Sequence, residues 1–449
     1  MLILKILLGL LGLGIVVFIH ELGHFLAARL VKIKVEAFSI GWGNPILKKK
    51  IGDVEYRLGM FPVGGYCKMS GETDYNEAWN NMKNGIKPED GSYLAASPAS
   101  RILVSFAGPF FNLIFAIILL CFIWGFGFEI KTLDNRIILA SEVTNDVYPA
   151  DNAGLKTGDR IVEINGKEIT YYHEVQENIA LNAEKALPIK VERDGFYYNL
   201  QITPALDKSS GAGKIGVYFW TDPVIDTVAE GSAAQRAGLL PGDIITAANG
   251  NPVLNTIDII KIMEEKPLEL VVEARRSGGV THQAVFSAQE LESELGISWK
   301  VITYRTPNLS IPAALAKGVK EGYKTLVVSI TSLKLLFKGI DLTQAVSGPV
   351  RITYMMGDMA AQGFGQSAAT GLRFLVDFIA LISVALCVMN LLPLPILDGG
   401  MIILFFVEMI RRKPAHPRVI SVFNACGMAI IFSLMAFALF GDIMYFIRR

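Results

Sequence analysis

The sequence predicts a multi-domain membrane protein. It has an α-helical transmembrane core of four spans, a membrane-associated β segment and two tandem α+β domains outside the membrane. Three observations predict this fold class. Four segments are long and apolar enough to cross a bilayer, which takes about 20 residues. A β-like stretch follows the first of these segments, and the polar middle region contains an internal repeat at an offset of 84 residues, from Ala153 to Ala237.

The composition also points to a membrane. Apolar residues make up 52% of the 449 residues and the mean hydropathy is +0.41, so part of the chain is expected in a bilayer. The net charge is 0 at pH 7, which argues against a general nucleic-acid binder, so we expect no nucleic-acid partner. The four cysteines form no CxxC motif and no Cys/His cluster, and a thiolate zinc site is therefore not expected.

The expected spans run from about Leu4 to Leu30, Ile102 to Phe128, Leu372 to Leu392 and Val419 to Ile447. The first could be taken for a secretory signal peptide, because Lys5 precedes the apolar stretch and small residues follow it. Cleavage there would discard the His and Glu residues inside the stretch, so a span is the better interpretation. Small and polar residues in the spans suit helix–helix contacts in lipid.

Loop charges predict the orientation of these spans. The segment from Arg29 to Arg101 and the short loop from Arg411 to Arg418 are both basic. Basic loops stay on the cytoplasmic side of a membrane. Both termini and the middle region are therefore expected outside the cytoplasm.

The repeat lies in that middle region. Residues 153–166 align with residues 237–250 in the pattern AGLxxGDxIxxxNG, and an apolar-periodic helix follows each copy, near 172–181 and 256–264. The Gly-Asp indicates a turn, the Ile a buried strand residue and the Asn-Gly a tight hairpin turn. The pattern resembles the PDZ signature, so we expect two tandem PDZ-like domains. Such domains bind extended peptides at a sheet edge. A spacer that binds nothing is the alternative, because neither copy has a clear GLGF-type carboxylate loop.

Two further segments carry structural signals. Residues 34–44 and 54–66 are short β-like runs broken by Gly and Pro, and they come directly after the first span. A strand formed by these residues could lie beside that span. Residues 310–338 alternate lysines with Leu and Val at helical spacing. This pattern predicts an amphipathic helix that lies on the membrane surface or packs on a partner.

The first span contains the strongest chemical signal. His20 and His24 are separated by one helical turn in an HExxH motif, so both imidazoles can reach one Zn²⁺ ion. Glu21 can act as general base on a water bound to that ion. Without a metal, the motif would place three polar groups in lipid at a cost of several kcal/mol each.

A catalytic zinc site needs a third protein ligand. His173, His282 and His416 are poorly placed, because two lie in the polar middle region and one in a basic loop. Asp398 is the best candidate, since a carboxylate at the edge of an apolar segment is costly unless it is used. The first and third spans run in the same direction, which brings Asp398 to the same side as the HExxH motif. A helix-end role for Asp398 is the alternative.

The residues Pro393-Leu394-Pro395, just before Asp398, would break a helix. Backbone groups freed in this way are tolerated in a bilayer where they face protein or a cavity. Asn390, at the end of the same span, could bond a neighbouring helix.

Together these features resemble the site-2 protease family, in its bacterial regulator of sigma-E protease branch. The resemblance rests on HELGH at 20–24, AGPFFN at 107–112, the stretch 390–400 and the tandem PDZ-like domains. It implies an intramembrane zinc metalloendopeptidase with Zn²⁺ as cofactor, His20, His24 and Asp398 as ligands, and Glu21 as catalytic base. It also implies that Asn390, Pro393 and Pro395 contact substrate and that residues 41–66 align it. The family often has Phe where Trp42 stands.

The same resemblance implies partners and location. The substrates would be single-span membrane proteins, either anti-sigma factors already cut by an upstream site-1-type protease or remnant signal peptides. Cleavage would belong to regulated intramembrane proteolysis in a stress response. The chain would be a multi-pass protein in contact with the lipid of a bacterial inner membrane, with its active site near the cytoplasmic side and its PDZ-like domains in the periplasm, acting as a size filter.

The alternative function is a non-enzymatic PDZ-like membrane scaffold with a structural metal site. In either case, the expected segments are a first span with HExxH at 1–33, a β segment and loop at 34–101, a second span at 102–128, PDZ-like domains at 129–210 and 211–308, an amphipathic helical segment at 309–370, a third span with the metal-ligand Asp at 371–400, a cytoplasmic loop at 401–418 and a fourth span at 419–449.

Overall fold

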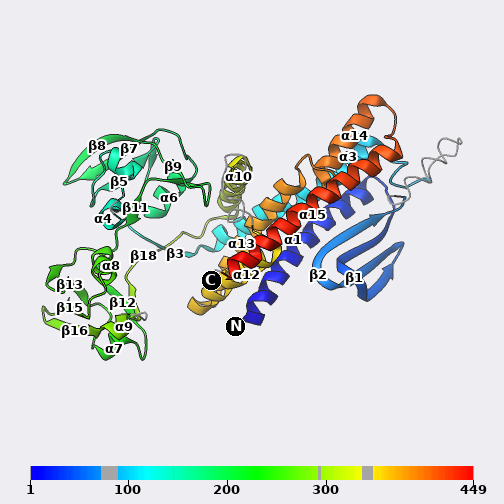
Figure 1. Cartoon of the computed structure of the whole chain (residues 1–449). Coiled ribbons are helices and arrows are strands. Elements are labelled where there is room, and N and C mark those ends of the chain that lie inside the picture. The colour runs from blue at the N-terminus through cyan, green and yellow to red at the C-terminus, as the bar shows by residue number, and fades with distance from the viewer. Residues whose placement is uncertain (1, 72–88, 145, 292–294, 336–346, 448–449) are drawn as a thin grey trace. The chain divides into compact units, whose positions relative to one another are not determined.

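The computed structural model describes residues 2–71, 89–144, 146–291, 295–335 and 347–447. The chain forms two compact units. We call residues 1–128 together with 306–449 the membrane unit, and residues 129–305 the repeat unit. Figure 1 shows the long helices of the membrane unit and the small sheets of the repeat unit.

The membrane unit is mainly helical. Its helices are α1 (Leu2–Leu30), α3 (Pro98–Phe126), α10 (Ile311–Leu335), α12 (Pro349–Gln366), α13 (Ala368–Asn390), α14 (Asp398–Arg411) and α15 (Pro417–Ile447). Four helical segments are long and apolar enough to cross a membrane: Lys5–Leu30, Pro98–Phe126, Ala368–Asn390 and Arg418–Ile447. This finding confirms that the four predicted segments are helices long and apolar enough to cross a membrane.

Close backbone approach holds α1, α3 and α13 together. A side chain at Gly23 of α1 would collide with the backbone of Ala107 in α3. Ser383 of α13 donates a hydrogen bond of 2.8 Å to the carbonyl of Asn112 in α3. Small residues and interhelical hydrogen bonds of this kind replace the hydrophobic effect, which does not drive helix association in lipid.

The expected amphipathic helix is α10, and it packs on α3. Gly318 lies against Cys121 and Gly322 against Ile117, so the two helices run antiparallel at close range. The sequence left open whether this helix lies on the membrane surface or packs on a partner; its contact with α3 of the same chain does not decide between the two. Helix α12 is a second helix in the expected segment 309–370. Its N-terminus is capped by Asp442 of α15, which accepts hydrogen bonds from the backbone N–H groups of Gly348, Val350 and Arg351.

The region around the third span differs from the prediction. Residues 371–400 were expected as one span and residues 401–418 as a loop, but α13 ends at Asn390 and α14 begins at Asp398. The prolines at 393 and 395 interrupt the helix, as expected. Residues 401–411 are helical because their apolar side chains pack on α3. The basic residues at 411–413 led the sequence prediction to treat the whole segment as a loop.

A buried ion pair fixes α14 on α3. Arg101 and Glu408 lie 2.8 Å apart, and their side chains are 5% and 2% exposed. The Arg101 guanidinium also stacks over Phe405, at 4.6 Å from the ring centre. The sequence had placed Arg101 among the loop charges, whereas the structure places it inside α3 and pairs it with the helix that Asp398 begins.

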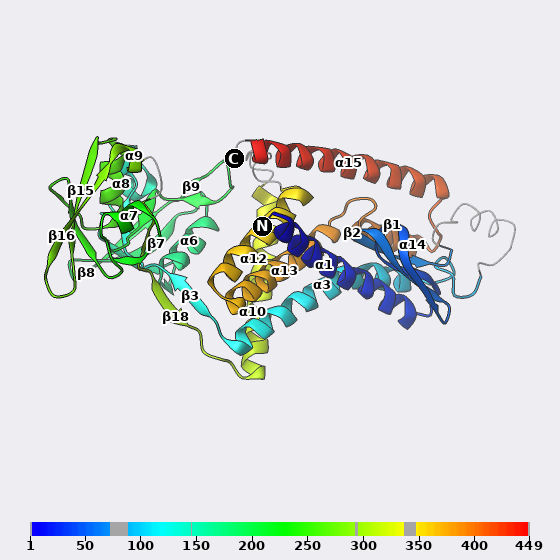
Figure 2. The ribbon, with the colours of Figure 1, turned by 90° about the horizontal axis from the view of Figure 1, so that it is seen from below.

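The β segment is a sheet formed by β1 (Val35–Ile51) and β2 (Val54–Met69), which are longer than the predicted runs. Ile40 pairs with both Gly65 and Leu58, so residues 35–40 lie in the middle of the sheet. Residues 65–69 form one edge and residues 47–51 the other. The sheet packs against α1 (Figure 2), where Phe38 meets the rings of Phe18 and Phe25 at 5.9 and 5.3 Å.

The repeat unit contains two four-stranded sheets with the same order, β6-β5-β7-β8 and β14-β13-β15-β16. The first copy comprises β5 (Arg160–Ile164), β6 (Lys167–Glu168), α6 (Tyr172–Ala180), β7 (Leu187–Arg193) and β8 (Phe196–Ile202). The second comprises β13 (Ile244–Ala248), β14 (Asn251–Pro252), α8 (Thr256–Glu264), β15 (Glu269–Arg275) and β16 (Thr281–Ser287). The internal repeat in the sequence therefore corresponds to two copies of the same strand order in the structure. The assignment of these copies as PDZ-like domains stays a prediction.

Short elements complete the repeat unit. The pairs are β3 (Glu129–Thr132) with β18 (Ile302–Arg305), β4 (Ile137–Leu139) with β11 (Val217–Phe219), β9 (Ala205–Leu206) with β10 (Gly213–Lys214), and β12 (Ile225–Val228) with β17 (Ile297–Trp299). The one-turn helices are α4 (Ser141–Thr144), α5 (Pro149–Asn152), α7 (Ala233–Arg236) and α9 (Ala288–Leu291).

The predicted Asn-Gly turns are confirmed in both copies. Asn165 and Gly166 have φ angles of 51° and 77°, and Asn249 and Gly250 have 47° and 76°. Two successive residues with positive φ are what a two-residue type I′ hairpin turn requires, which explains the choice of Asn and Gly.

The Asp of each Gly-Asp pair does more than form a turn. Asp159 is buried and bound by Arg193, and Asp243 is bound in the same way by Arg276. In both copies the same guanidinium also donates to the carbonyl of the repeat's first Gly, Gly154 or Gly238. Burial alone would raise the pKa of Asp243, but the hydrogen bonds from Arg276 and the Leu240 N–H outweigh it and lower that pKa.

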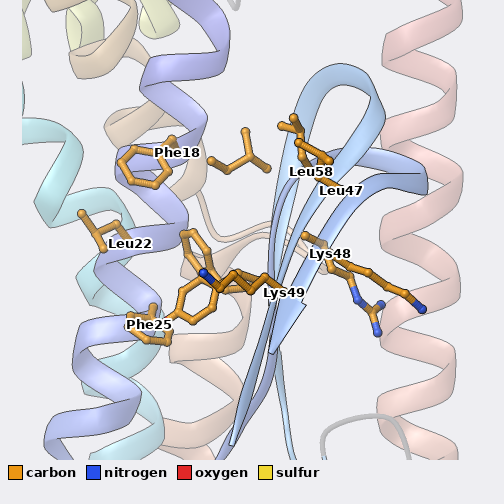
Figure 3. A pocket seen from close by; sticks show the side chains of 11 residues that line it. Phe18, Leu22, Phe25, Leu47, Lys48, Lys49 and Leu58 are labelled. Atoms are coloured by element: carbon orange, nitrogen blue, oxygen red, sulfur yellow. The ribbon is translucent and has the colours of Figure 1, made fainter. Parts of the chain in front are cut away.

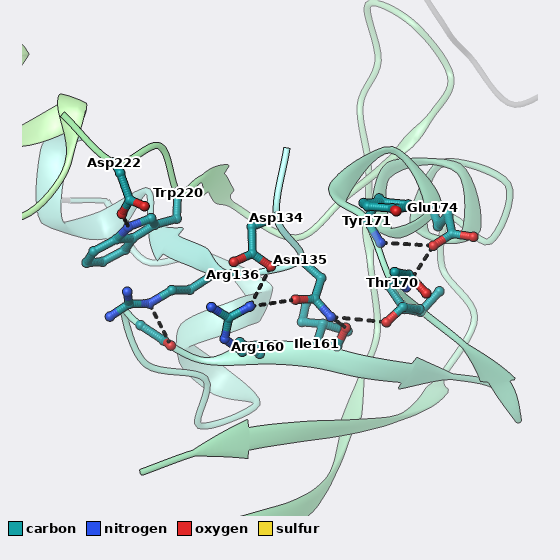
Figure 4. Close-up of polar contacts among 12 residues, drawn as sticks. Asp134, Asn135, Arg136, Arg160, Ile161, Thr170, Tyr171, Glu174, Trp220 and Asp222 are labelled. Atoms are coloured by element: carbon teal, nitrogen blue, oxygen red, sulfur yellow. Dashed lines mark hydrogen bonds and ion pairs between the residues drawn. The ribbon is translucent and has the colours of Figure 1, made fainter. Parts of the chain in front are cut away.

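Polar contacts also order the first copy and its junction with the second (Figure 4). Asn135 donates from its amide to the carbonyls of Ile161 and Ile169. Arg136 stacks 3.5 Å from the centre of the Trp220 ring, and Trp220 donates its indole N–H to Asp222. Trp220 is also buried with Ile138 of the first copy and Ile257 of the second, so the two copies share a small apolar contact.

We expect Arg276→Met to destabilise the repeat unit by about 2–3 kcal/mol. The change removes the partner of a buried carboxylate, whereas Arg276 itself is partly exposed, which moderates the cost. Urea-dependent pulse proteolysis of the full chain measures the effect. Arg275→Met is the matched control, because Arg275 is exposed and its loss should change stability by less than about 0.5 kcal/mol. Equal stability of the two variants would contradict the role of the Asp243–Arg276 pair.

Candidate metal centre

Three predicted ligands meet in the membrane unit. The Nε2 atoms of His20 and His24 are 3.1 Å apart. Asp398 lies 3.2 Å from His20 and 3.5 Å from His24, measured from its carboxylate oxygens to the Nε2 atoms. One ligand atom from each residue can be chosen so that all lie within 4.8 Å of one another, which makes the group a candidate metal site. The structure thus joins residues that are separated by more than 370 positions in sequence.

Two helices, α1 and α14, carry these side chains. α1 presents both imidazoles on one face, because His20 and His24 are four residues apart on a helix. Asp398 is the first residue of α14, immediately after the turn that Pro393 and Pro395 enforce. Gly399 and Gly400 allow this helix start to lie against the carbonyls of Leu391, Leu392 and Leu394, where any side chain would collide.

Helix α3 supports the two imidazoles from behind. His24 Nδ1 lies 2.8 Å from the carbonyl oxygen of Val104, so the ring donates its Nδ1–H there and leaves the Nε2 lone pair for a metal. Asn112 is fully buried, and its amide nitrogen lies 3.4 Å from His20 Nδ1. Its Oδ1 has no hydrogen-bond partner among the described residues. Rotating the amide by 180° would let this oxygen accept from His20 Nδ1–H, which is the tautomer that an Nε2 ligand needs.

Gly108 gives the imidazoles their space. A Cβ atom built on Gly108 would lie closer than 3.0 Å to both imidazole rings. The motif AGPFFN therefore contributes two features that the sequence prediction had treated only as helix–helix contacts, the absent side chain at Gly108 and the amide of Asn112. In the sequence, the signal for a role of Gly108 and Asn112 at the site was their position in a candidate span that follows the span with the HExxH motif.

The donor set fits zinc. Two imidazole nitrogens and a carboxylate oxygen are usual catalytic zinc ligands, at about 2.0–2.2 Å from the ion. Ligand atoms of a tetrahedral site with such bonds lie roughly 3.3 Å apart, and the three separations here are 3.1, 3.2 and 3.5 Å. A fourth position of such a site would be left for water or substrate.

Glu21 lies on α1 between the two ligands and contacts the sheet. A Cβ atom on Gly65 would come within 3.1 Å of Glu21 Cγ, so the edge strand 65–69 passes directly beside this residue. The sequence predicted a strand next to the metal helix, and the structure places one there.

The predicted substrate-contacting residues lie between α13 and α14. Asn390 is the last residue of α13 and is partly exposed, and its side chain has no hydrogen-bond partner among the described residues. Pro393 and Pro395 lie in the turn that leads to Asp398. This placement keeps all of them within eight residues of a candidate ligand, while their role is untested.

The remaining histidines lie outside the metal cluster. His173 contacts Thr132, His282 contacts the carbonyl of Ala237, and His416 accepts a hydrogen bond from the Arg418 backbone N–H. The structure therefore agrees with their exclusion as ligands. Among the described residues, Asp398 is the carboxylate that groups with His20 and His24 in the candidate metal site.

The sequence matches the model of peptidase family M50 over residues 8–434. The chain belongs to peptidase family M50. It is 37% identical over 443 residues to a "putative zinc metalloprotease" of Treponema pallidum, with 98% of each chain covered. It is 30% identical to the "regulator of sigma E protease" of Haemophilus influenzae and to a "putative zinc metalloprotease" of Borreliella burgdorferi, with 96% and 98% of each chain covered.

Family membership confirms the resemblance to site-2 proteases and the prediction of a zinc metalloendopeptidase. Zinc is supported by the family and by the geometry of His20, His24 and Asp398. The candidate spans agree with a membrane protease.

Gly108→Ala is expected to lower zinc affinity about 10- to 100-fold. The added methyl group would push the imidazoles of His20 and His24 away from Asn112 and the Val104 carbonyl, which orient the two rings. Zinc content by elemental analysis, together with competition against a chromogenic chelator, measures this. Gly125→Ala is a matched control on the same helix, since its Cβ would have its nearest neighbour 3.9 Å away. Undiminished affinity in Gly108→Ala would show that α3 does not support the site.

Proposed function

We propose that this M50 peptidase hydrolyses peptide bonds within the membrane, in the transmembrane segments of single-span proteins. The observation that carries the proposal is the convergence of His20, His24 and Asp398 from helices α1 and α14. Two of these ligands lie inside a segment that is apolar enough to span a bilayer. Polar side chains at such a position are costly and by default functional.

The site residues suggest how the reaction runs. A bound zinc ion would lower the pKa of its water to about 7 and polarise the scissile carbonyl. Glu21 would accept the proton from the attacking water and pass it to the leaving amine. Val104 and Asn112 would hold the imidazoles in the ligating tautomer throughout.

The substrate must also be presented as an extended chain. A transmembrane helix hides its peptide bonds in internal hydrogen bonds, so it has to unwind before attack. Strand addition to an open edge would replace part of the lost hydrogen bonding. The edge 65–69 is suited to this role because Gly65 lies against Glu21, which would align an added strand with the base. Asn390, Pro393 and Pro395 would contact substrate from the side of Asp398.

The sigma-E naming of a relative suggests the pathway. The substrates would be anti-sigma-factor-like proteins already shortened by an upstream site-1-type protease, with remnant signal peptides as a second class. The chain would act in regulated intramembrane proteolysis in a bacterial inner membrane. Its basic loops would be cytoplasmic, and its termini and PDZ-like repeats would lie outside the cytoplasm.

Glu21→Gln should retain zinc and substrate but lower the cleavage rate at least about 100-fold, because the amide cannot accept the proton. Cleavage of a purified single-span substrate in detergent, with zinc content measured on the same samples, tests this. Chelation with 1,10-phenanthroline should stop cleavage by the unmodified chain. Zinc-bound protein with no chelator-sensitive cleavage of any candidate substrate would instead support a scaffold with a structural metal site.

We further propose that the repeat unit acts as a size filter that excludes substrates with intact outer domains. The motivation is that the repeat unit is inserted as one block, between Phe128 and Thr306, at the end of α3. These two residues bond each other through the Phe128 N–H and the Thr306 hydroxyl at 2.8 Å, so the block enters and leaves the membrane unit at one point.

Replacing residues 133–301 by an Asn-Gly turn tests the filter. Thr132 and Ile302 are cross-strand partners, so the turn can close the β3–β18 ladder without disturbing the membrane unit. The shortened chain should cleave a substrate with or without its outer domain, whereas the full chain should cleave only the truncated form. Equal zinc content of both chains is the control, and unchanged selectivity would contradict the filter.

A further inference from the structure

A cavity of about 700 Å³ lies between α1 and the β1–β2 sheet, separate from the metal centre (Figure 3). Its size falls within the range of about 300–1,000 Å³ that is usual for small-molecule sites. Phe18, Leu22 and Phe25 line it from α1, and Leu47, Leu58 and Lys49 line it from the sheet. Neither the metal site nor the proposed substrate edge uses these side chains.

The cavity exists because the sheet is wider than its contact with α1. The middle of the sheet packs on the helix through Phe38, whereas residues 47–51 form the opposite edge from the one beside Glu21. Leu47 is 65% exposed and Leu58 39% exposed, so this side of the sheet offers large aliphatic groups that the described residues leave partly uncovered. The α1 wall belongs to the candidate span Lys5–Leu30, which places the cavity where an acyl chain can enter it.

Three basic side chains line the apolar cavity: Lys48, Lys49 and Arg57. Lys49 is the cross-strand neighbour of Tyr56, so the two side chains share the face of the sheet that meets α1. Figure 3 shows Lys49 reaching toward α1 and Lys48 on the other side of the sheet. Arg57 is satisfied by Glu55 and Tyr66, whereas Lys49 has no ion-pair partner among the residues that the structure describes. A lysine stem can lie along an apolar wall with its ammonium at the rim.

We propose that this cavity binds an anionic phospholipid, with one acyl chain between α1 and the sheet and the phosphate at Lys49 and the Tyr56 hydroxyl. The apolar walls select an acyl chain, and Lys49, on the face of the sheet that meets α1, favours a headgroup with net negative charge over a zwitterionic one. Such a lipid wedges the sheet against α1. The same sheet contacts Glu21 through Gly65, so the bound lipid supports the strand proposed to receive substrate.

Native mass spectrometry of the full chain tests the proposal after incubation with vesicles of equal phosphatidylglycerol and phosphatidylethanolamine. The unmodified chain should retain phosphatidylglycerol in preference to phosphatidylethanolamine. Lys49→Gln should lower retained phosphatidylglycerol about fivefold, the effect of one lysine near an anionic lipid. Lys50→Gln is the matched control, because it removes the same charge from the adjacent residue on the other face of the strand and should leave retention unchanged.

A second variant tests the acyl-chain site itself. Leu58→Trp fills the cavity from the sheet and should reduce the retention of both lipids, while zinc content stays at the level of the unmodified chain. Three results would overturn the proposal: equal retention of the two lipids by the unmodified chain, unchanged retention in Lys49→Gln, or an equal loss in Lys50→Gln. The last result would show that general surface charge, and not this cavity, holds the lipid.

Discussion

The meeting of two imidazoles and one carboxylate among apolar helices is the constraint on which the rest of the membrane unit depends. His20 and His24 lie in a helix apolar enough to span a membrane, and in such surroundings the polar groups of His20, His24 and Asp398 need partners other than water. A bound metal would satisfy all three together, and the separations of their ligand atoms fit a tetrahedral site. Each of these polar groups is costly in apolar surroundings unless all three share a metal. The helices that carry them must therefore be fixed accurately relative to one another.

Several features of the helices follow from this need for accuracy. Gly23 and Gly108 allow α1 and α3 to approach so closely that Val104 and Asn112 can bond the backs of the two rings. The prolines after α13 end that helix and start a new one at Asp398. The buried Arg101–Glu408 pair then fixes this second helix on α3, where an unpaired charge would be strongly destabilising.

The sequence was informative wherever a local pattern determines the structure. Hydropathy predicted four helices apolar enough to span a membrane, and HExxH with the direction of the spans predicted that His20, His24 and Asp398 would meet, as they do in the candidate metal site. Features that depend on tertiary contacts were missed. Helix α14 looked like a loop because its basic end hid its apolar face, and Arg101 looked like a loop charge because its partner Glu408 lies more than 300 residues away. The roles of Gly108 and Asn112 likewise become visible only when α3 is placed behind α1.

The β1–β2 sheet shows how one element can serve two environments. Its edge at 65–69 passes the base candidate Glu21, where backbone groups matter and Gly65 provides room for close approach. Its opposite edge at 47–51 carries exposed aliphatic groups and lysines, side chains that would suit the lipid site proposed there. The middle of the sheet is anchored on α1 by Phe38. The edge at 47–51 is connected to the strand beside Glu21 through the paired segments 54–58 and 35–40, so a displacement at one edge would be passed to the other through these pairings.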